Sequence, residues 1–119
     1  MSEPVVVDPA ALDRLREWGG EKLLSQMIRL FLDNSPARMD QIRSGAQQDG
    51  DVEEAEKGAH SLKSSAATLG AEELRGLAAT MEGHASDRDQ AAVAELLPRL
   101  EEAYTRAREA LEPMIGGEP

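Results

Sequence analysis

Between residues 52 and 69, apolar side chains recur at every third or fourth position, which is the period of a helix with one buried face. The stripe consists of Val52, Ala55, Ala59, Leu62, Ala66 and Leu69. Asp51 precedes the stripe and is a suitable N-cap, and Gly70 follows it and can adopt the left-handed conformation that ends many helices. The segment therefore predicts a helix over residues 52–69 that must bury its apolar side against other elements.

The region before this helix predicts a short helix and a long one. Asp8-Pro9 is an N-cap followed by proline at the first helical position, and Gly19-Gly20 ends the short helix. Apolar residues then continue at helical spacing from about residue 21 to residue 47. Pro36 disfavours helical geometry at Ser35, which predicts a kink or a break there. One long bent helix and two helices end to end are both compatible with this pattern.

Two more helical segments follow, from Ala71 to about Ala85 and from about Asp89 to Leu111, the latter with a bend expected at Pro98. The connections between successive long helices are short, which favours antiparallel neighbours. The predicted fold is all-α: an antiparallel up-down four-helix bundle with a short additional N-terminal helix. We expect one domain over residues 1–119, frayed at 1–7 and 113–119.

The composition limits the classes of function that the chain can serve. Acidic residues outnumber basic ones by 23 to 13, for a formal net charge of -10, so binding to a nucleic-acid backbone is not expected. The absence of cysteine excludes disulfides, thiolate metal ligands and cysteine nucleophiles. No apolar run approaches the length of a membrane span, and no signal-peptide pattern opens the sequence. We therefore expect a cytoplasmic monomer without nucleic-acid or membrane partners.

His60 lies on the outward side of the predicted 52–69 helix. At about 100° per residue it falls roughly 130° from the centre of the apolar stripe, so core packing does not explain it. A neutral imidazole is a nitrogen nucleophile near pH 7, and its attack on a phosphoryl group would give a phosphohistidine. Lys63 and Ser64 follow one turn along, where a cation favours added negative charge and a small residue leaves the ring accessible. An ordinary surface histidine is the alternative interpretation.

The run from Ala59 to Ala66, followed by Leu69-Gly70-Ala71, resembles the signature of histidine-containing phosphotransfer (HPt) domains of two-component phosphorelays. The family pattern has the acceptor histidine, then an aliphatic residue two positions on, a lysine at three, a small residue at four and a glycine at ten. These places are occupied by His60, Leu62, Lys63, Ser64 and Gly70. The small residue is often glycine in the family and is serine here. Asp8-Pro9, the run before Pro36 and the pair Met81-Glu82 extend the resemblance over nearly the whole chain.

The resemblance implies that His60 accepts a phosphoryl group from a receiver-domain aspartate and passes it to another receiver domain. It implies that Lys63 stabilises the phosphoryl charge and that Ser64 gives access to the ring. The implied partners are receiver domains of response regulators or of a hybrid sensor histidine kinase, which supply Mg²⁺ and the catalytic pocket. The chain itself is then a carrier rather than an enzyme, without a cofactor, and its sequence has no ATP-binding pattern.

In some members of the family, a polar residue at the place of Glu82 hydrogen-bonds the acceptor imidazole. Glu82 could orient the ring of His60 and raise its basicity, while its charge could repel the phosphoryl group. A solvated helix residue is the simpler interpretation of Glu82, as a surface residue is of His84.

Two other classes of function compete with this one. A metalloenzyme built in a helical bundle needs an inward Glu-x-x-His pair on each of two helices. Glu56 lies four residues before His60, and Glu82 lies two before His84, so the required spacing is absent. A module that binds or sequesters receiver domains without being phosphorylated would show the same surface pattern, and only phosphate labelling distinguishes it.

Overall fold

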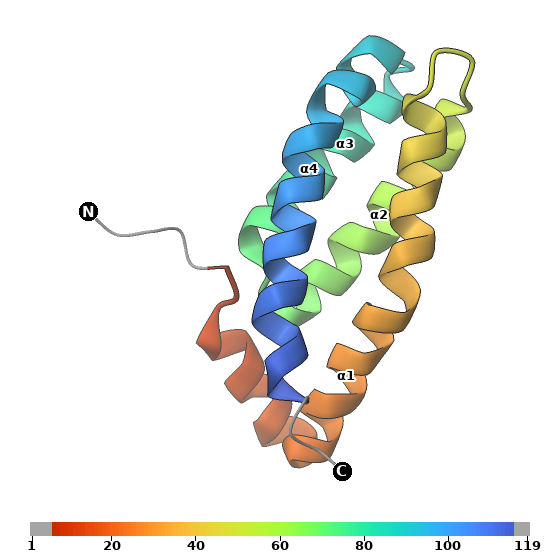
Figure 1. Ribbon diagram of the computed structural model, residues 1–119. Helices are drawn as coiled ribbons and strands as arrows, with labels where there is room; N and C mark the ends of the chain where they lie inside the picture. Colours follow the sequence, from red (N-terminus) through yellow and green to blue (C-terminus); the bar gives the residue numbers. More distant parts are fainter. Residues whose placement is uncertain (1–5, 116–119) are drawn as a thin grey trace.

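The computed structural model describes residues 6–115 as a bundle of helices (Figure 1). The elements are α1 (Pro9–Ala46), α2 (Val52–Leu69), α3 (Glu72–Ser86), α4 (Gln90–Leu111) and a 3-10 turn over Glu112–Met114. Successive helices run antiparallel, and α4 also packs against α1, which closes the bundle. No strand occurs within residues 6–115. The prediction of an all-α, antiparallel four-helix bundle is confirmed.

The two ends of the chain were predicted to fray over residues 1–7 and 113–119. Residues 1–5 and 116–119 lie outside the described part of the chain. At the limits of that part, Val7 and Ile115 are both half-buried and pack against the core.

A pair of glycines divides α1 into a short helix and a long one. Gly19 and Gly20 have non-helical backbone angles, and the φ of Gly20 is +71°, in the left-handed region that favours glycine. The short helix begins at Pro9, and the Asp8 carboxylate accepts a hydrogen bond of 3.0 Å from the backbone N–H of Ala10. The predicted N-terminal helix, its cap and its stop are therefore all present.

Pro36 does not break α1, so the alternative of two helices end to end is wrong. Gly19 and Gly20 are the residues of α1 with non-helical angles, and the helix continues through Pro36 to Ala46. The neighbouring Ser35 is buried, and its hydroxyl is hydrogen-bonded to the hydroxyl of Tyr104 on α4 at 2.9 Å. This contact holds the proline-containing turn against α4, and tertiary packing of this kind can outweigh a proline's local preference.

Both ends of α2 have the caps that the sequence predicts. The Asp51 carboxylate accepts a hydrogen bond of 2.9 Å from the backbone N–H of Glu53. Gly70 is left-handed, with φ of 72°. The N–H groups of Gly70 and Ala71 donate to the carbonyls of Ala67 and Ala66, which is the Schellman pattern. The helix that carries His60 is therefore fixed at both ends by local hydrogen bonds.

Apart from Val52, which is half-buried, the apolar stripe of α2 is buried against α1 and α3, and its opposite face remains outside the bundle. Ala55, Ala59 and Ala66 have no exposed surface. Gly58 lets this part of α2 approach the backbone of α1, because a Cβ at that position would lie 2.7 Å from the carbonyl oxygen of Arg38. The close packing on one side of α2 leaves His60 on the other, as the sequence predicts.

Candidate functional site

His60 projects from the outward face of α2, near the middle of the helix. Its side chain is 64% exposed. Lys57 and Ser64, one turn before and one turn after, are also exposed. Because serine is small, the surface on the C-terminal side of the imidazole is low, and a second molecule can reach the ring from that direction.

Two side chains of the site bond to one carboxylate on α3. The Nδ1 atom of His60 lies 2.8 Å from Oε2 of Glu82, and the Nζ atom of Lys63 lies 2.6 Å from Oε1 of the same residue. The Glu82 side chain is 22% exposed and that of Lys63 is 34% exposed. The structure thus brings together His60, Lys63 and Glu82. Glu82 is 22 residues from His60 and 19 residues from Lys63 along the chain.

The charge on Glu82 determines which nitrogen of His60 carries the proton. The hydrogen bond from Lys63 lowers the pKa of Glu82, the bond from His60 lowers it further, and partial burial opposes both. An ionised carboxylate only accepts hydrogen bonds. Nδ1 of His60 must therefore be the protonated nitrogen in this contact, an assignment made from its hydrogen-bond partner. In the neutral ring, Nε2 then holds the lone pair.

The interpretation of Glu82 as a solvated helix residue is wrong. Its neighbour Met81 is fully buried in the core, which places Glu82 at the seam where α3 faces α2. Both of its carboxylate oxygens are hydrogen-bonded there. The sequence places Glu82 next to a core position, but the register between two helices decides which residues of α2 it meets.

An open cavity of about 400 Å³ lies beside the imidazole. Its walls are Glu56, Lys57, His60, Ser61 and Glu82. The cavity contains both acidic and basic groups and opens to solvent at the exposed side of His60. It is therefore wide enough for a phosphoryl group to approach the ring.

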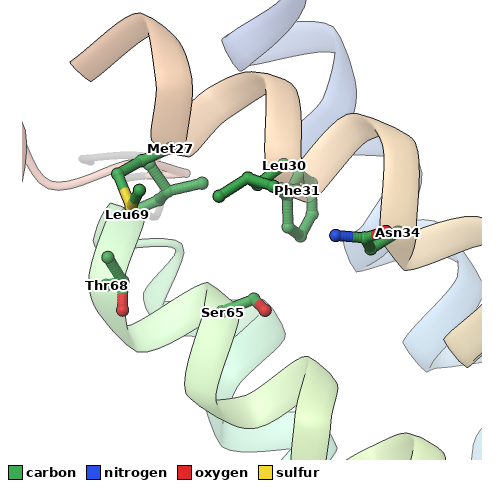
Figure 2. A pocket seen from close by; sticks show the side chains of 7 residues that line it. All are labelled: Met27, Leu30, Phe31, Asn34, Ser65, Thr68 and Leu69. Atoms are coloured by element: carbon green, nitrogen blue, oxygen red, sulfur yellow. The ribbon is translucent and has the colours of Figure 1, made fainter. Parts of the chain in front are cut away.

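A second hollow, between α1 and α2, was not predicted from the sequence. Figure 2 shows the α1 side chains on one side of it and the α2 side chains on the other; they are Met27, Leu30, Phe31, Asn34, Ser65, Thr68 and Leu69. Its volume is about 210 Å³. Leu30 is 51% exposed at its edge, whereas Phe31 is buried. Ser65 and Thr68 line this groove on the C-terminal side of His60 along α2, and both are exposed.

His84 lies apart from this arrangement. It lines a different hollow, between α3 and α4, together with residues such as Glu95 and Arg99. Across residues 6–115, no group of three or more histidine and acidic side chains is placed to hold a metal ion. In the same part of the chain, no helix is long and apolar enough to cross a membrane.

A family model and a solved structure are both similar to this chain. The family model of the Hpt domain matches residues 26–110, which is more than half of the chain. Among solved structures, the chain is similar to a protein from rice described as a histidine-containing phosphotransfer protein, with a TM-score of 0.79 and 18% sequence identity. The similarity covers 93% of this chain and 80% of the rice chain, and at this identity it shows the fold. No curated protein matches the chain.

Proposed function

Because the chain belongs to the Hpt domain family, we propose that it is a phosphorelay intermediate that takes a phosphoryl group onto His60 from a receiver aspartate and passes it to a second receiver. Members of this family are histidine phosphotransfer carriers of phosphorelays. The single observation that carries the assignment to His60 is its geometry. The ring is 64% exposed, and its Nδ1 atom is bonded to a carboxylate, so the nucleophilic nitrogen faces outward.

The proposed transfer needs little from this chain beyond a positioned nucleophile. Nε2 of His60 attacks the phosphorus of the receiver's aspartyl phosphate, the N–P bond forms, and the P–O bond to the aspartate breaks with its electron pair. Lys63 lies one turn along α2 and supplies a positive charge for the phosphoryl oxygens. Ser64 leaves room for the partner. The receiver supplies Mg²⁺ and the acidic pocket, so the carrier itself uses no cofactor and has no kinase activity of its own.

We place the docking surface for receiver domains on the outward face of α2 and on the groove between α1 and α2. The groove is lined by both apolar and polar side chains, and Leu30 exposes half of its surface at its edge, as expected of an anchor that becomes buried on binding. On α2 the groove begins at Ser65, about 7.5 Å along the helix axis from His60, which is the rise of five helical residues. We propose that a partner that covers the outward face of α2 contacts both the imidazole and this groove. The carrier is proposed to act in the cytoplasm and as a monomer.

Phosphotransfer from isolated receiver domains tests this proposal. A receiver phosphorylated with a small phosphodonor is mixed with the wild-type protein, with His60→Gln and with His84→Gln, and the carrier is then offered a second, unphosphorylated receiver. Wild type and His84→Gln should become labelled and should pass the label on, whereas His60→Gln should remain unlabelled. Labelling of His60→Gln at the wild-type rate would refute the assignment. Tight binding of a receiver without any labelling would instead make the chain a sequestering module.

A further inference from the structure

The two lysines of α2 lie on either side of His60, three residues before it and three residues after it. The Nζ atom of Lys63 lies 2.6 Å from Oε1 of Glu82, so the charge of Lys63 is already paired with a carboxylate. Lys57 is exposed and lines the cavity beside the imidazole, and it makes no hydrogen bond or ion pair within residues 6–115. Of the two lysines that flank the nucleophile, Lys57 is therefore the one whose charge is available to another molecule.

The charge balance beside the ring depends on Lys57 and on its neighbour Glu56. Glu56 lines the same cavity, is half-buried, and likewise has no hydrogen-bond or ion-pair partner in the described part of the chain. The pair formed by Lys63 and Glu82 adds no net charge. The two unpaired side chains thus nearly cancel each other, but Lys57 is the more exposed of the two. A partner that approaches the outward face of α2 therefore has better access to the positive charge.

The position of this cation is significant because the chain as a whole is acidic. Its formal net charge is -10, which repels an anionic partner. A phosphoryl group on the partner adds negative charge at the point where that partner must approach His60. Charges at the rim of an interface act mainly on the rate of association and on the choice of partner. An unpaired lysine one turn from the imidazole is placed to offset the repulsion where the two molecules meet.

We propose that Lys57 is a docking residue that pairs with an acidic side chain of the receiver, beside the receiver's phosphorylated aspartate. This inference rests on the proposed function of His60. The pairing acts on association and on partner choice, because a receiver with a neutral or basic side chain at that place loses the attraction. Lys63, which lies on the other side of the ring, remains the residue that meets the phosphoryl oxygens.

The spacing of the helix supports this division between the two lysines. Residues three apart on a helix have Cβ atoms about 5–6 Å from each other, and a lysine carries its charge at the end of a flexible four-carbon stem. A standard protein interface covers about 800 Å² on each partner, so a receiver centred on His60 also covers Lys57. The charge of Lys57 therefore lies inside the contact area, and no intramolecular carboxylate has to release it first.

Two substitutions that remove opposite charges from the same cavity test the proposal. Lys57→Gln and Glu56→Gln each replace an unpaired charged side chain by a neutral one, so neither removes a contact within residues 6–115. Lys57→Arg keeps the positive charge. Lys22→Gln is the matched control, because Lys22 is an exposed lysine of α1 outside both the cavity and the groove. The probe is an isolated receiver domain, phosphorylated with a small phosphodonor, that labels the wild-type protein.

Initial transfer rates are measured against receiver concentration at low and at high salt. At low salt, we expect kcat/KM of Lys57→Gln to fall roughly threefold to fivefold and that of Glu56→Gln to rise by a similar factor, with kcat unchanged in both. Lys57→Arg and Lys22→Gln should follow the wild type. At about 1 M salt, where the Debye length is about 3 Å, all the variants should converge on the wild-type value. The lifetime of the phosphohistidine should be the same in Lys57→Gln as in the wild type.

The contrary outcomes are distinct from one another. Equal slowing of Lys57→Gln and Glu56→Gln, or slowing that persists at high salt, would mean that shape rather than charge is being read, and would refute the proposal. A shorter phosphohistidine lifetime in Lys57→Gln would place this lysine on the phosphoryl group and would also refute it. Wild-type rates in every variant would refute it while leaving His60 as the acceptor. Absence of phosphate on His60 of the wild type would instead refute the proposed function.

Discussion

Two glycines in neighbouring helices should respond in opposite directions to the same substitution. Gly58 on α2 faces the backbone of α1, and a Cβ there would lie 2.7 Å from the carbonyl oxygen of Arg38 and 3.0 Å from Cβ of Gln41. Gly76 on α3 is exposed, and a Cβ there would meet nothing within 4 Å. Both glycines are inside helices, so replacement by alanine raises the intrinsic helix propensity equally at the two positions.

The magnitudes follow from these distances. Alanine is favoured over glycine inside a helix by about 1 kcal/mol, which is the expected gain in the free energy of unfolding for Gly76→Ala. In Gly58→Ala the new methyl group must push a helix backbone away, and overpacking of this kind costs about 1–3 kcal/mol. The net result for Gly58→Ala is a loss of up to about 2 kcal/mol. The two variants should therefore differ by about 1–3 kcal/mol, although their chemical change is identical.

Thermal and urea unfolding followed by circular dichroism measures this difference directly. For a chain of this length, about 1 kcal/mol corresponds to roughly 4 °C in Tm. Gly76→Ala should unfold above the wild type and Gly58→Ala below it, with unchanged urea m-values. Equal stabilisation of both variants would show that α2 does not lie against the α1 backbone as described. That result would also remove the reason why His60 is held on the opposite face.

Three other substitutions address the site and the core. Leu30→Glu should slow phosphotransfer from a receiver about tenfold, because it replaces an apolar anchor at the edge of the groove with a charge. Met114→Glu, at a similarly exposed residue on the 3-10 turn, should leave the rate unchanged. Lys63→Ala should shorten the lifetime of the phosphohistidine roughly twofold to fivefold, and an unchanged lifetime would exclude Lys63 from the mechanism. Tyr104→Phe should lower the free energy of unfolding by about 1–2 kcal/mol in urea titrations, because buried Ser35 loses its partner; wild-type stability would contradict this.

The features that could be predicted from the sequence are those fixed by nearby residues. The caps of α2 at Asp51 and Gly70 depend on hydrogen bonds within a few positions, and both are where the sequence places them. The stop at Gly19-Gly20 is equally local. The outward position of His60 follows from the period of a single helix. Each of these depends on backbone geometry that no distant contact can easily change.

The features that could not be predicted depend on how the helices meet. Whether Pro36 breaks α1 is decided partly by the contact between Ser35 and Tyr104, which are 69 residues apart. The two hydrogen bonds of Glu82 require the register between α2 and α3, and the groove beside Leu30 requires the spacing between α1 and α2. Helical periodicity identifies which face of each helix is buried, but it contains no information about the register or the spacing between two helices.

The proposed phosphotransfer requires that Nε2 of His60 is the atom that receives the phosphoryl group. Nuclear magnetic resonance of the phosphorylated, nitrogen-labelled protein tests it most directly, because coupling between phosphorus and a ring nitrogen identifies both the residue and the atom. We expect one phosphorylated imidazole, that of His60, with phosphorus bonded to Nε2 and a proton retained on Nδ1. Phosphorus on Nδ1 of His60, or on the ring of His84, would contradict it.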